Sequence, residues 1–229
     1  MKVRTEAKRE VIVQEARRLF LEMGYERATM GELSRRIGGS KATLYGYFRS
    51  KEELFVAVIE QLAETHLEDA VTELGHLGRD NLATGLTRFA FQLMRLMTEP
   101  DALAMQRVVV GESSRTDVGE MFSELGPGRV QTALTAALRA AMDRGDLQPG
   151  PADVLAMQFM GLVRAEIDLR SFMRSPAPLA ASQLQVMARR AVQMFLGGYA
   201  AVGATALPEE QAPGPAAPAD GHDPAPKAA

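Results

Sequence analysis

Residues 29–54 read TMGELSRRIGGSKATLYGYFRSKEEL, and this stretch decides the fold of the chain. Thr29 precedes Glu32 by three positions, a spacing typical of the capping box that begins a helix. The pair Gly38-Gly39 ends that helix, because glycine adopts the left-handed backbone conformation without a steric penalty. Ser40 is then a favourable N-cap for a second helix. The stretch therefore predicts two short helices joined by a Gly-Gly-Ser turn, which is a helix-turn-helix.

The second helix of the pair, expected over residues 41–48, carries an unusual set of side chains. Leu44 and Phe48 lie four residues apart and can pack inward, while a lysine, a threonine and two tyrosines remain on the other faces. Hydroxyl and cationic donors of this kind contact phosphates and base edges when a helix lies in the major groove of DNA. The next helix begins after Ser50 and has Lys51 in its first turn, which favours a phosphate site. The alternative is an ordinary three-helix unit whose polar side chains are only solvated.

The string SKATLYGYFRSKEELF at residues 40–55 strongly resembles the TetR family of bacterial one-component transcriptional regulators. The preceding string, IVQEARRLFLEMGYERATMGELSRRIG at residues 12–38, looks like the first helix of that family and the lead-in to its helix-turn-helix. The order of caps, turn and aromatic pair makes the resemblance specific. The chain departs from the family at Gly31 and Gly39, where larger residues are more common.

The resemblance also assigns roles within the helix-turn-helix. The DNA-binding residues that it implies are Thr29, Ser40, Lys41, Thr43, Tyr45, Tyr47 and Lys51. Of these, the ones expected to hold phosphates are Thr29, Tyr45, Tyr47 and Lys51. Lys41 and Thr43 are expected to approach base edges.

The rest of the chain shows helical periodicity almost throughout, with no period-2 pattern of any length. We expect a first helix that Gly24 ends, and further helices over residues 51–74, 81–98, 102–113, 117–125, 127–144, 151–173 and 182–202. The predicted fold class is all-α. It combines an N-terminal three-helix helix-turn-helix DNA-binding domain with a C-terminal helical bundle for ligand binding and dimerisation. The expected boundaries are 1–54 for the first domain, 55–205 for the second, and 206–229 for a disordered tail rich in Pro and Ala.

The body has a resemblance of its own. The string MQRVVVGESSRTDVGEMFSELGPGRVQTAL at residues 105–134 is similar to the C-terminal domain of the AefR-like branch of the TetR family. The chain keeps Arg107, Glu112, Phe122 and Gly126-Pro127, but it lacks the aromatic residue and the proline that the branch has near residues 115–117. In the family that the chain resembles, the last two helices form the dimer interface. The resemblance therefore implies a homodimer.

A helical bundle of this composition is expected to hold a small, mostly apolar ligand between its helices. Methionines are frequent in the expected helices, and methionine adapts to irregular cavities. The predicted ligand-binding residues are Met105, Glu112, Phe159 and Arg164, with Glu112 and Arg164 as the polar anchors. The alternative is that the charged residues form solvated faces or interhelical salt bridges, and that the methionines are core.

Composition limits the function further. The net charge is −3, but residues 1–54 carry +4 and the remainder −7, so only the N-terminal part has the polarity that suits phosphates. The chain has no cysteine, and no signal peptide or membrane span is apparent, so a cytoplasmic setting is expected. His66, His76 and His222 are the only histidines, and their spacing does not suit a metal site. No catalytic or nucleotide motif occurs, so neither a metal nor a cofactor is expected.

The sequence thus predicts a homodimeric repressor that an apolar ligand releases from a palindromic operator. The helix that begins after Ser50 is expected to transmit the signal, because it joins the DNA-binding head to the body. Three alternatives remain at this point: an activator of the same fold, an all-helical enzyme, and a protein–protein adaptor whose helix-turn-helix does not touch DNA.

Overall fold

The computed structural model describes residues 5–64, 67–75, 77 and 81–201. Within these residues every regular element is helical, and the one β-type pairing is an isolated antiparallel bridge between Leu147 and Ala200. The all-α prediction is confirmed. The expected tail and all three histidines (His66, His76 and His222) lie outside the described residues. None of the described helices is both long enough and apolar enough to cross a membrane.

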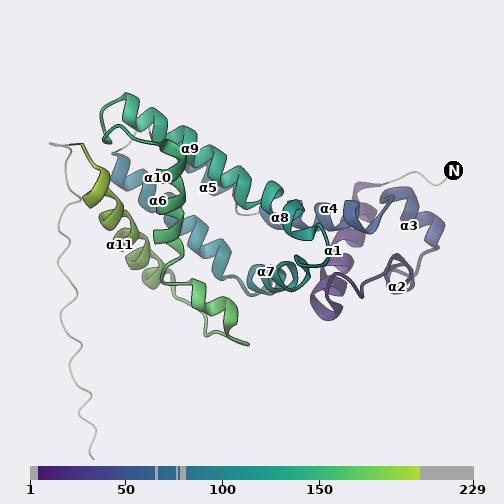
Figure 1. Cartoon of the computed structure of the whole chain (residues 1–229). Helices are drawn as coiled ribbons and strands as arrows, with labels where there is room; N and C mark the ends of the chain where they lie inside the picture. Colours follow the sequence, from purple (N-terminus) through teal and green to yellow (C-terminus); the bar gives the residue numbers. More distant parts are fainter. Residues whose placement is uncertain (1–4, 65–66, 76, 78–80, 202–229) are drawn as a thin grey trace, which may run out of the picture.

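Three helices form the N-terminal head, which is the purple part at the right of Figure 1: α1 (Glu6–Met23), α2 (Met30–Arg36) and α3 (Lys41–Tyr47). Each begins at a hydroxyl cap. The side-chain oxygens of Thr5, Thr29 and Ser40 accept hydrogen bonds from backbone N–H groups three residues on. Gly24 ends α1 with φ +78°, a conformation that favours glycine, so the predicted end of the first helix is confirmed.

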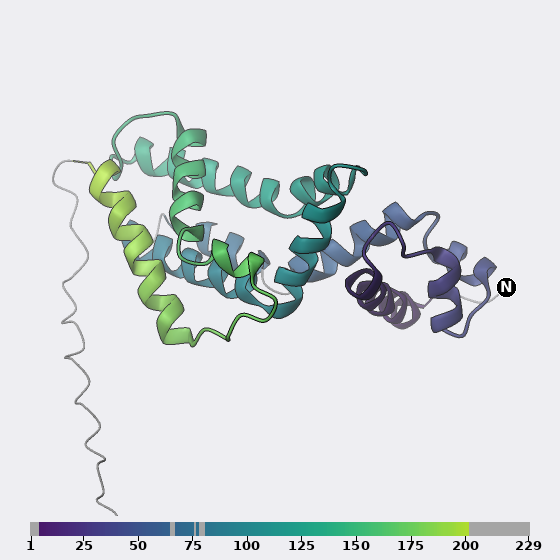
Figure 2. The ribbon, with the colours of Figure 1, turned by 60° about the horizontal axis from the view of Figure 1, so that its bottom comes forward.

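The remaining elements form the body: α4 (Lys51–Glu64), α5 (Leu67–Gly75), α6 (Leu82–Thr98), α7 (Pro100–Glu112), α8 (Val118–Leu125), α9 (Pro127–Asp143), α10 (Ala152–Arg164), the 3-10 helix η1 (Asp168–Phe172) and α11 (Ala181–Tyr199). Figures 1 and 2 show α11 running along the outside of the bundle, where it packs against α6 and α10. Phe159 lies at the centre of this core, with ring centroids 6.1 Å from Phe89 and 5.0 Å from Phe195.

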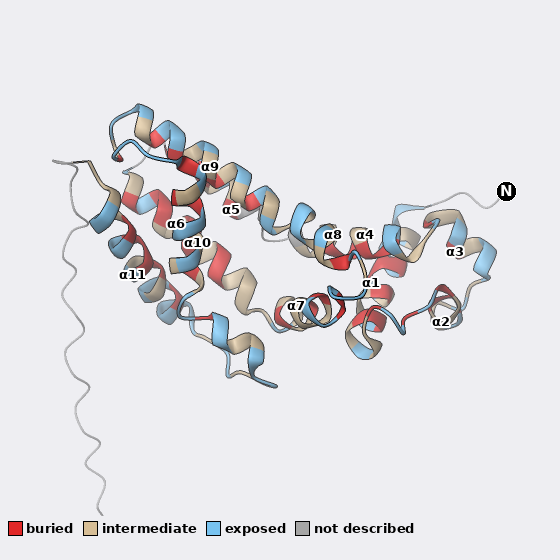
Figure 3. Ribbon diagram, viewed as in Figure 1, coloured by how far each residue is buried: buried red, intermediate tan, exposed pale blue. Residues whose placement is uncertain are grey.

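The head does not have a core of its own. Its buried cluster includes Phe20, Leu44 and Phe55, and it also takes in Met105 and Val118 from α7 and α8. Figure 3 shows this buried region at the junction of α1, α4, α7 and α8. The predicted boundary at residues 54 and 55 falls inside α4, whose residues up to Ile59 belong to the same cluster. Head and body are therefore joined by continuous packing.

Two helix predictions differ from the structure. The helix expected over residues 151–173 ends at Arg164, because Ala165 and Ile167 donate to carbonyls only three residues back and the chain tightens into η1. This turn buries Ile167 but leaves Phe172 85% exposed. The single helix expected over residues 51–74 is described as α4 and α5, with residues 65–66 between them outside the described part.

Candidate nucleic-acid interface and ligand cavity

Helix α3 presents a polar face to solvent. Leu44 is fully buried and fixes the orientation of the helix against α1 and α2. Lys41 and Tyr45 are consequently exposed, and Thr43 is half-buried beside the cap, where its hydroxyl lies 2.9 Å from that of Ser40. Exposed hydroxyl and amino groups on a helix that follows a tight turn can donate to DNA phosphates and base edges.

The two tyrosines of α3 differ in their surroundings. Tyr45 is 49% exposed, and no described residue bonds its hydroxyl. Tyr47 is half-buried, and its hydroxyl accepts a hydrogen bond of 3.1 Å from the backbone N–H of Thr5, the cap of α1. Tyr47 thus links the N-terminus of α1 to the end of α3, while its hydroxyl hydrogen remains available to a phosphate.

Lys51 belongs to a cluster that fastens α4 to the loop between α1 and α2. Its Nζ donates to the carbonyl oxygens of Tyr25 (3.0 Å) and Glu26 (3.3 Å), and it lies 4.2 Å from the centroid of the Tyr25 ring. The Tyr25 hydroxyl in turn donates to Glu52 at 3.2 Å. The predicted phosphate ligand is therefore also a structural donor within the chain.

Burial raises the pKa of the Tyr25 hydroxyl, and the Glu52 carboxylate adds to the effect. The pKa of Glu52 is lowered, first because its own backbone N–H bonds the carboxylate, and further because Ser50 and Tyr25 donate to it and Lys51 is close. The cluster is therefore held with Tyr25 protonated and Glu52 ionised.

Most other cations of the head are already paired. Arg36 bonds Glu22 and Glu32, and Arg35 bonds Glu32, which lowers the pKa of that carboxyl. Two cations on or beside α3 make no ion pair with any described residue: Lys41 and Arg49. Arg49 lies directly before the Ser50 cap and was not among the predicted DNA-binding residues.

Gly31 is part of this arrangement. A Cβ atom on Gly31 would lie 3.3 Å from Cε of Lys41, which is tighter than ordinary contact. The side chain of Lys41 therefore lies against the backbone of α2, and the absence of a side chain at residue 31 leaves room for it. This explains a position where the sequence departs from the resemblance.

A mostly apolar cavity of about 260 Å³ lies between α4 and the helices α6 to α10. Gln106 and Arg164 are its polar lining residues. The apolar lining comes from Ile59, Leu62, Leu93, Leu96, Met97, Ala102, Met105, Val109, Val110, Phe122, Gly126, Pro127, Val130 and Met160. Such a cavity suits an apolar ligand with one or two polar groups.

Only two of the four predicted ligand residues line this cavity. Met105 and Arg164 line the cavity, and Arg164 is also paired with Asp168 at 3.0 Å. Phe159 and Glu112 do not line it, so their prediction as ligand residues is not supported by the geometry. Phe159 is fully buried in the bundle core, because its face of α10 points toward α6 and α11. Glu112 lies at the head–body junction, where it accepts a bond of 3.3 Å from the backbone N–H of Glu26.

The outer surfaces of α10 and α11 carry apolar residues that nothing in the described chain covers. Met157 is 55% exposed, Val186 46% and Met194 69%. Gly161 and Gly197 lie on the same exposed faces, and a Cβ atom at either would meet nothing within 4 Å. Small and apolar residues on two neighbouring helices permit close approach by another helix pair.

Both the N-terminal and the C-terminal part of the chain match models of known protein families. Residues 12–58 match the model of "Bacterial regulatory proteins, tetR family", and residues 84–201 match that of the "AefR-like transcriptional repressor, C-terminal domain". The chain belongs to the TetR family. This confirms both resemblances drawn from the sequence, and it places the chain in a family of regulatory proteins and not among enzymes.

Individual relatives agree with this assignment. An HTH-type transcriptional repressor of Mycobacterium tuberculosis is 39% identical over 79 residues, which are 34% of this chain and 42% of that protein. The match thus spans less than half of that relative. The nucleoid occlusion factor SlmA of Vibrio cholerae is 29% identical over 177 residues, covering 73% of this chain and 85% of its own.

Solved structures share the fold over nearly the whole described chain. A TetR-family regulator of Mesorhizobium loti superposes with a TM-score of 0.74 at 23% identity, covering 87% of this chain and 100% of that one. The flavonoid-responsive regulator FrrA gives a TM-score of 0.66 at 28% identity, covering 86% of this chain and 98% of its own.

Proposed function

We propose that this TetR-family chain is a cytoplasmic, homodimeric transcriptional repressor that a small, mostly apolar effector releases from DNA. In this proposal residues 1–54 bind DNA, and residues 55–205 bind the effector and dimerise. The observation that carries the proposal is the face of α3. It holds the exposed Lys41 and the exposed Tyr45, whose side-chain polar groups bond no described residue.

DNA would be bound with α3 in the major groove and the flanking caps at the backbone. Lys41 and Thr43 would approach base edges, because they lie in the first turn of the recognition helix. Phosphates would be held on both sides of the groove by Thr29, Ser40, Tyr45, Tyr47 and Lys51, and by Arg49 as an addition from the structure.

The dimer would form through the outer faces of α10 and α11. The exposed Met157, Val186 and Met194, together with the glycines between them, support this surface. A two-fold dimer reads two copies of one half-site, so the operator should be a near-palindrome. The half-site centres should lie roughly 34–36 Å apart, or a small multiple of that distance.

The effector would occupy the cavity of about 260 Å³. Its lining favours an apolar or aromatic molecule with few polar groups, for which Gln106 and Arg164 are the anchors. The relative FrrA is described as flavonoid-responsive, and a flavonoid is a flat aromatic molecule of this general chemistry. Aromatic compounds of this kind are therefore a suitable first group to test.

Release requires that the effector bind the released conformation better than the DNA-bound one. Helix α4 can transmit the difference, because Ile59 and Leu62 line the cavity while Leu54 and Phe55 belong to the head core. Helix α7 offers a second connection, since its Met105 lines the cavity and also belongs to the head core. An effector that displaces either helix would change the spacing between the two recognition helices of a dimer.

Fluorescence anisotropy with DNA from upstream of the chain's own gene tests the proposal. We expect saturable binding that unrelated DNA does not compete away at the same concentration. A thermal-shift screen of flavonoids and other aromatic compounds should then identify molecules that raise the melting temperature and release the DNA. Val110→Trp, which fills the cavity from its solvent side, should bind DNA normally and lose the response. Failure to bind any genomic segment in a genome-wide experiment would contradict the DNA-binding proposal.

A further inference from the structure

A second cavity, of about 390 Å³, lies on the other side of α7 from the proposed effector site. It is formed where α6 ends and α7 begins, and the segment between η1 and α11 covers it. Leu103 and Arg107 of α7 line it, whereas Ala102, Met105 and Val109 of the same helix line the effector cavity. Because the two sets lie on different stripes of one helix, the cavities are separate.

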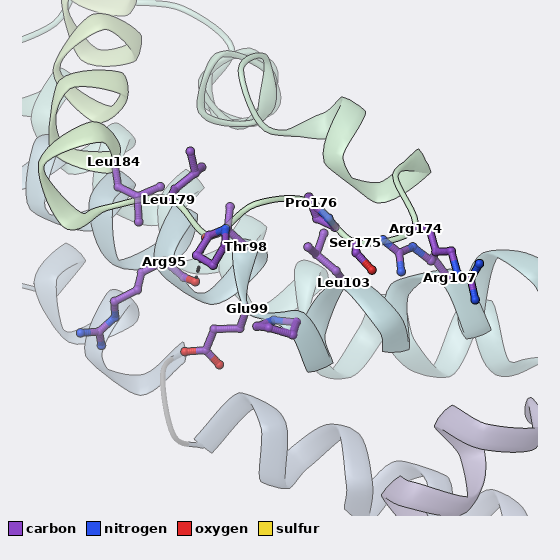
Figure 4. A pocket seen from close by; sticks show the side chains of 12 residues that line it. Arg95, Thr98, Glu99, Leu103, Arg107, Arg174, Ser175, Pro176, Leu179 and Leu184 are labelled. Carbon is purple, nitrogen blue, oxygen red and sulfur yellow. Dashed lines mark hydrogen bonds between the residues drawn. The ribbon is translucent and has the colours of Figure 1, made fainter. Parts of the chain in front are cut away.

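The second cavity is polarised along its length. Figure 4 shows Arg107 and Arg174 close together at one end, with Leu179 and Leu184 at the other and Leu103 between them. Arg95, Thr98 and Glu99 also line the cavity, and the charged ends of Arg95 and Glu99 point away from the arginine pair. Three prolines of the lining, Pro100, Pro176 and Pro178, extend the apolar surface. A ligand that fits this shape has a polar group at one end and an apolar chain at the other.

The polar end is cationic. Arg107 donates from Nε to the carbonyl oxygen of Ser171 at 2.7 Å and from one terminal nitrogen to the carbonyl oxygens of Arg170 and Met173. Backbone carbonyls orient the guanidinium but do not neutralise it. No carboxylate of the described chain is paired with Arg107 or Arg174. Two positive charges therefore face one end of the cavity, and they select an anion.

The opposite end excludes strongly hydrated ligands. Leu184 at this end and Leu103 in the middle of the cavity are each 4% exposed, so the apolar part of the lining belongs to the packed interior. A polyphosphate or a sugar would leave polar groups against these leucines without hydrogen-bond partners, which is costly. A medium-length aliphatic carboxylate satisfies both ends, because its chain covers the leucines and its oxygens reach the arginines.

We propose that this cavity is a second ligand site of the chain, specific for a small amphipathic carboxylate and independent of the apolar effector cavity. The proposal does not depend on DNA binding or on the effector, since it concerns binding to a separate place in the body. Ser175 lies beside the arginine pair and is exposed, so its substitution can alter the charge of the site without disturbing the core.

Isothermal titration calorimetry with octanoate tests the proposal on the full chain, with 1-octanol and octylamine as the neutral and cationic analogues. We expect saturable binding of octanoate and at least tenfold weaker binding of both analogues. Arg174→Gln should weaken octanoate binding about fivefold, the upper range for one exposed charge pair. Ser175→Glu should abolish it, because the new carboxylate pairs with the arginines and repels the ligand.

Matched controls separate this site from the rest of the chain. Arg129→Gln and Ser182→Glu make the same chemical changes at exposed residues that line neither cavity, and both should bind octanoate normally. Val110→Trp should also bind it normally, because it fills only the effector cavity. The proposal is overturned if octanoate does not bind at millimolar concentration, if octanol binds equally well, or if Val110→Trp abolishes binding while Ser175→Glu does not.

Discussion

The two tyrosines of α3 show how a single contact can divide similar residues. Tyr47 is tied to the backbone of Thr5, whereas the hydroxyl of Tyr45 faces solvent. Tyr45→Phe removes one free donor and leaves the packing unchanged. We expect DNA affinity to fall severalfold, as for one lost hydrogen bond of about 1 kcal/mol, with no change in the melting temperature. Tyr199→Phe removes a hydroxyl that bonds Gln158 in the body and should leave DNA affinity unchanged. Equal affinity of Tyr45→Phe and the original chain would argue against a phosphate contact there.

Lys51 raises a different question, because its amino group already bonds two carbonyl oxygens. Lys51→Met keeps an aliphatic side chain at this position and removes the amino group that lies over the Tyr25 ring. We expect the free energy of unfolding to fall by about 1 kcal/mol, and DNA affinity to fall at every salt concentration. If Lys51 also holds a phosphate, the slope of log affinity against log salt should become shallower by about one unit. An unchanged slope would mean that Lys51 acts only by fastening α4 to the head.

The Glu52 carboxylate makes the head sensitive to acid. Its pKa is lowered in the folded chain, so its contribution to stability is complete above the unfolded pKa of roughly 4.3 and is lost as the pH falls through the folded value. Glu52→Gln should therefore lower the melting temperature at neutral pH. On acidification to about pH 3, the melting temperature of the variant should then fall less than that of the original chain. The same substitution at exposed Glu124 is the control. If the melting temperatures of Glu52→Gln and of the original chain fell by the same amount on acidification, this role would be contradicted.

At the scale of elements, helix ends were the most predictable feature. Thr29, Ser40 and Gly24 act where their chemistry requires, because caps and left-handed glycines are local and need no partner from elsewhere in the chain. The helix expected over residues 151–173 was predicted too long, since it ends at Arg164, and the reason is not local. The apolar spacing continues through Phe172, but the tertiary fold buries Ile167 by turning the chain, and periodicity alone does not reveal that turn.

Gly24 ends α1 and also lies at the head–body junction, next to Glu112 of α7. Its φ of +78° disfavours other residues, and an added Cβ would lie 3.1 Å from the Glu112 oxygen that bonds Glu26. Gly24→Ala should lower the free energy of unfolding by about 1–3 kcal/mol from the backbone alone, because φ +78° with ψ 166° is a region that essentially only glycine adopts, and by more because Glu112 must shift. Gly38→Ala is the matched control, since Gly38 has φ +63° and open space around it. Urea unfolding gives the free energy of unfolding of both variants. An equal loss of free energy in the two would show that the Glu112 contact adds nothing.

At the scale of the whole molecule, the sequence predicted the helices of the head more fully than the lining of the cavity. The recognition-helix residues follow from local spacing and resemblance. The cavity depends on which stripes of α7 and α10 face each other, and this is why Met105 and Arg164 line it while Phe159 and Glu112 do not. The same limit applies to Ala191, which lies on the last helix, one of the two that the resemblance assigns to the dimer interface. It is buried in the chain's own core, so a charge there would test folding instead of dimerisation.

Met194 is the proper test of the proposed dimer. It is 69% exposed on the outer face of α11, one turn from Gly197, so a charge at this position does not disturb the core of the chain. Met194→Glu would bury one charge from each protomer in the proposed interface, which strongly disfavours association. We expect sedimentation to show a dimer for the original chain and a monomer for the variant at micromolar concentration. DNA affinity should then fall steeply, because the two half-sites are no longer bound as a unit. Gln185→Glu, also exposed on α11, controls for added charge. An original chain that sediments as a monomer would refute the dimer, and a dimeric Met194→Glu would place the interface elsewhere.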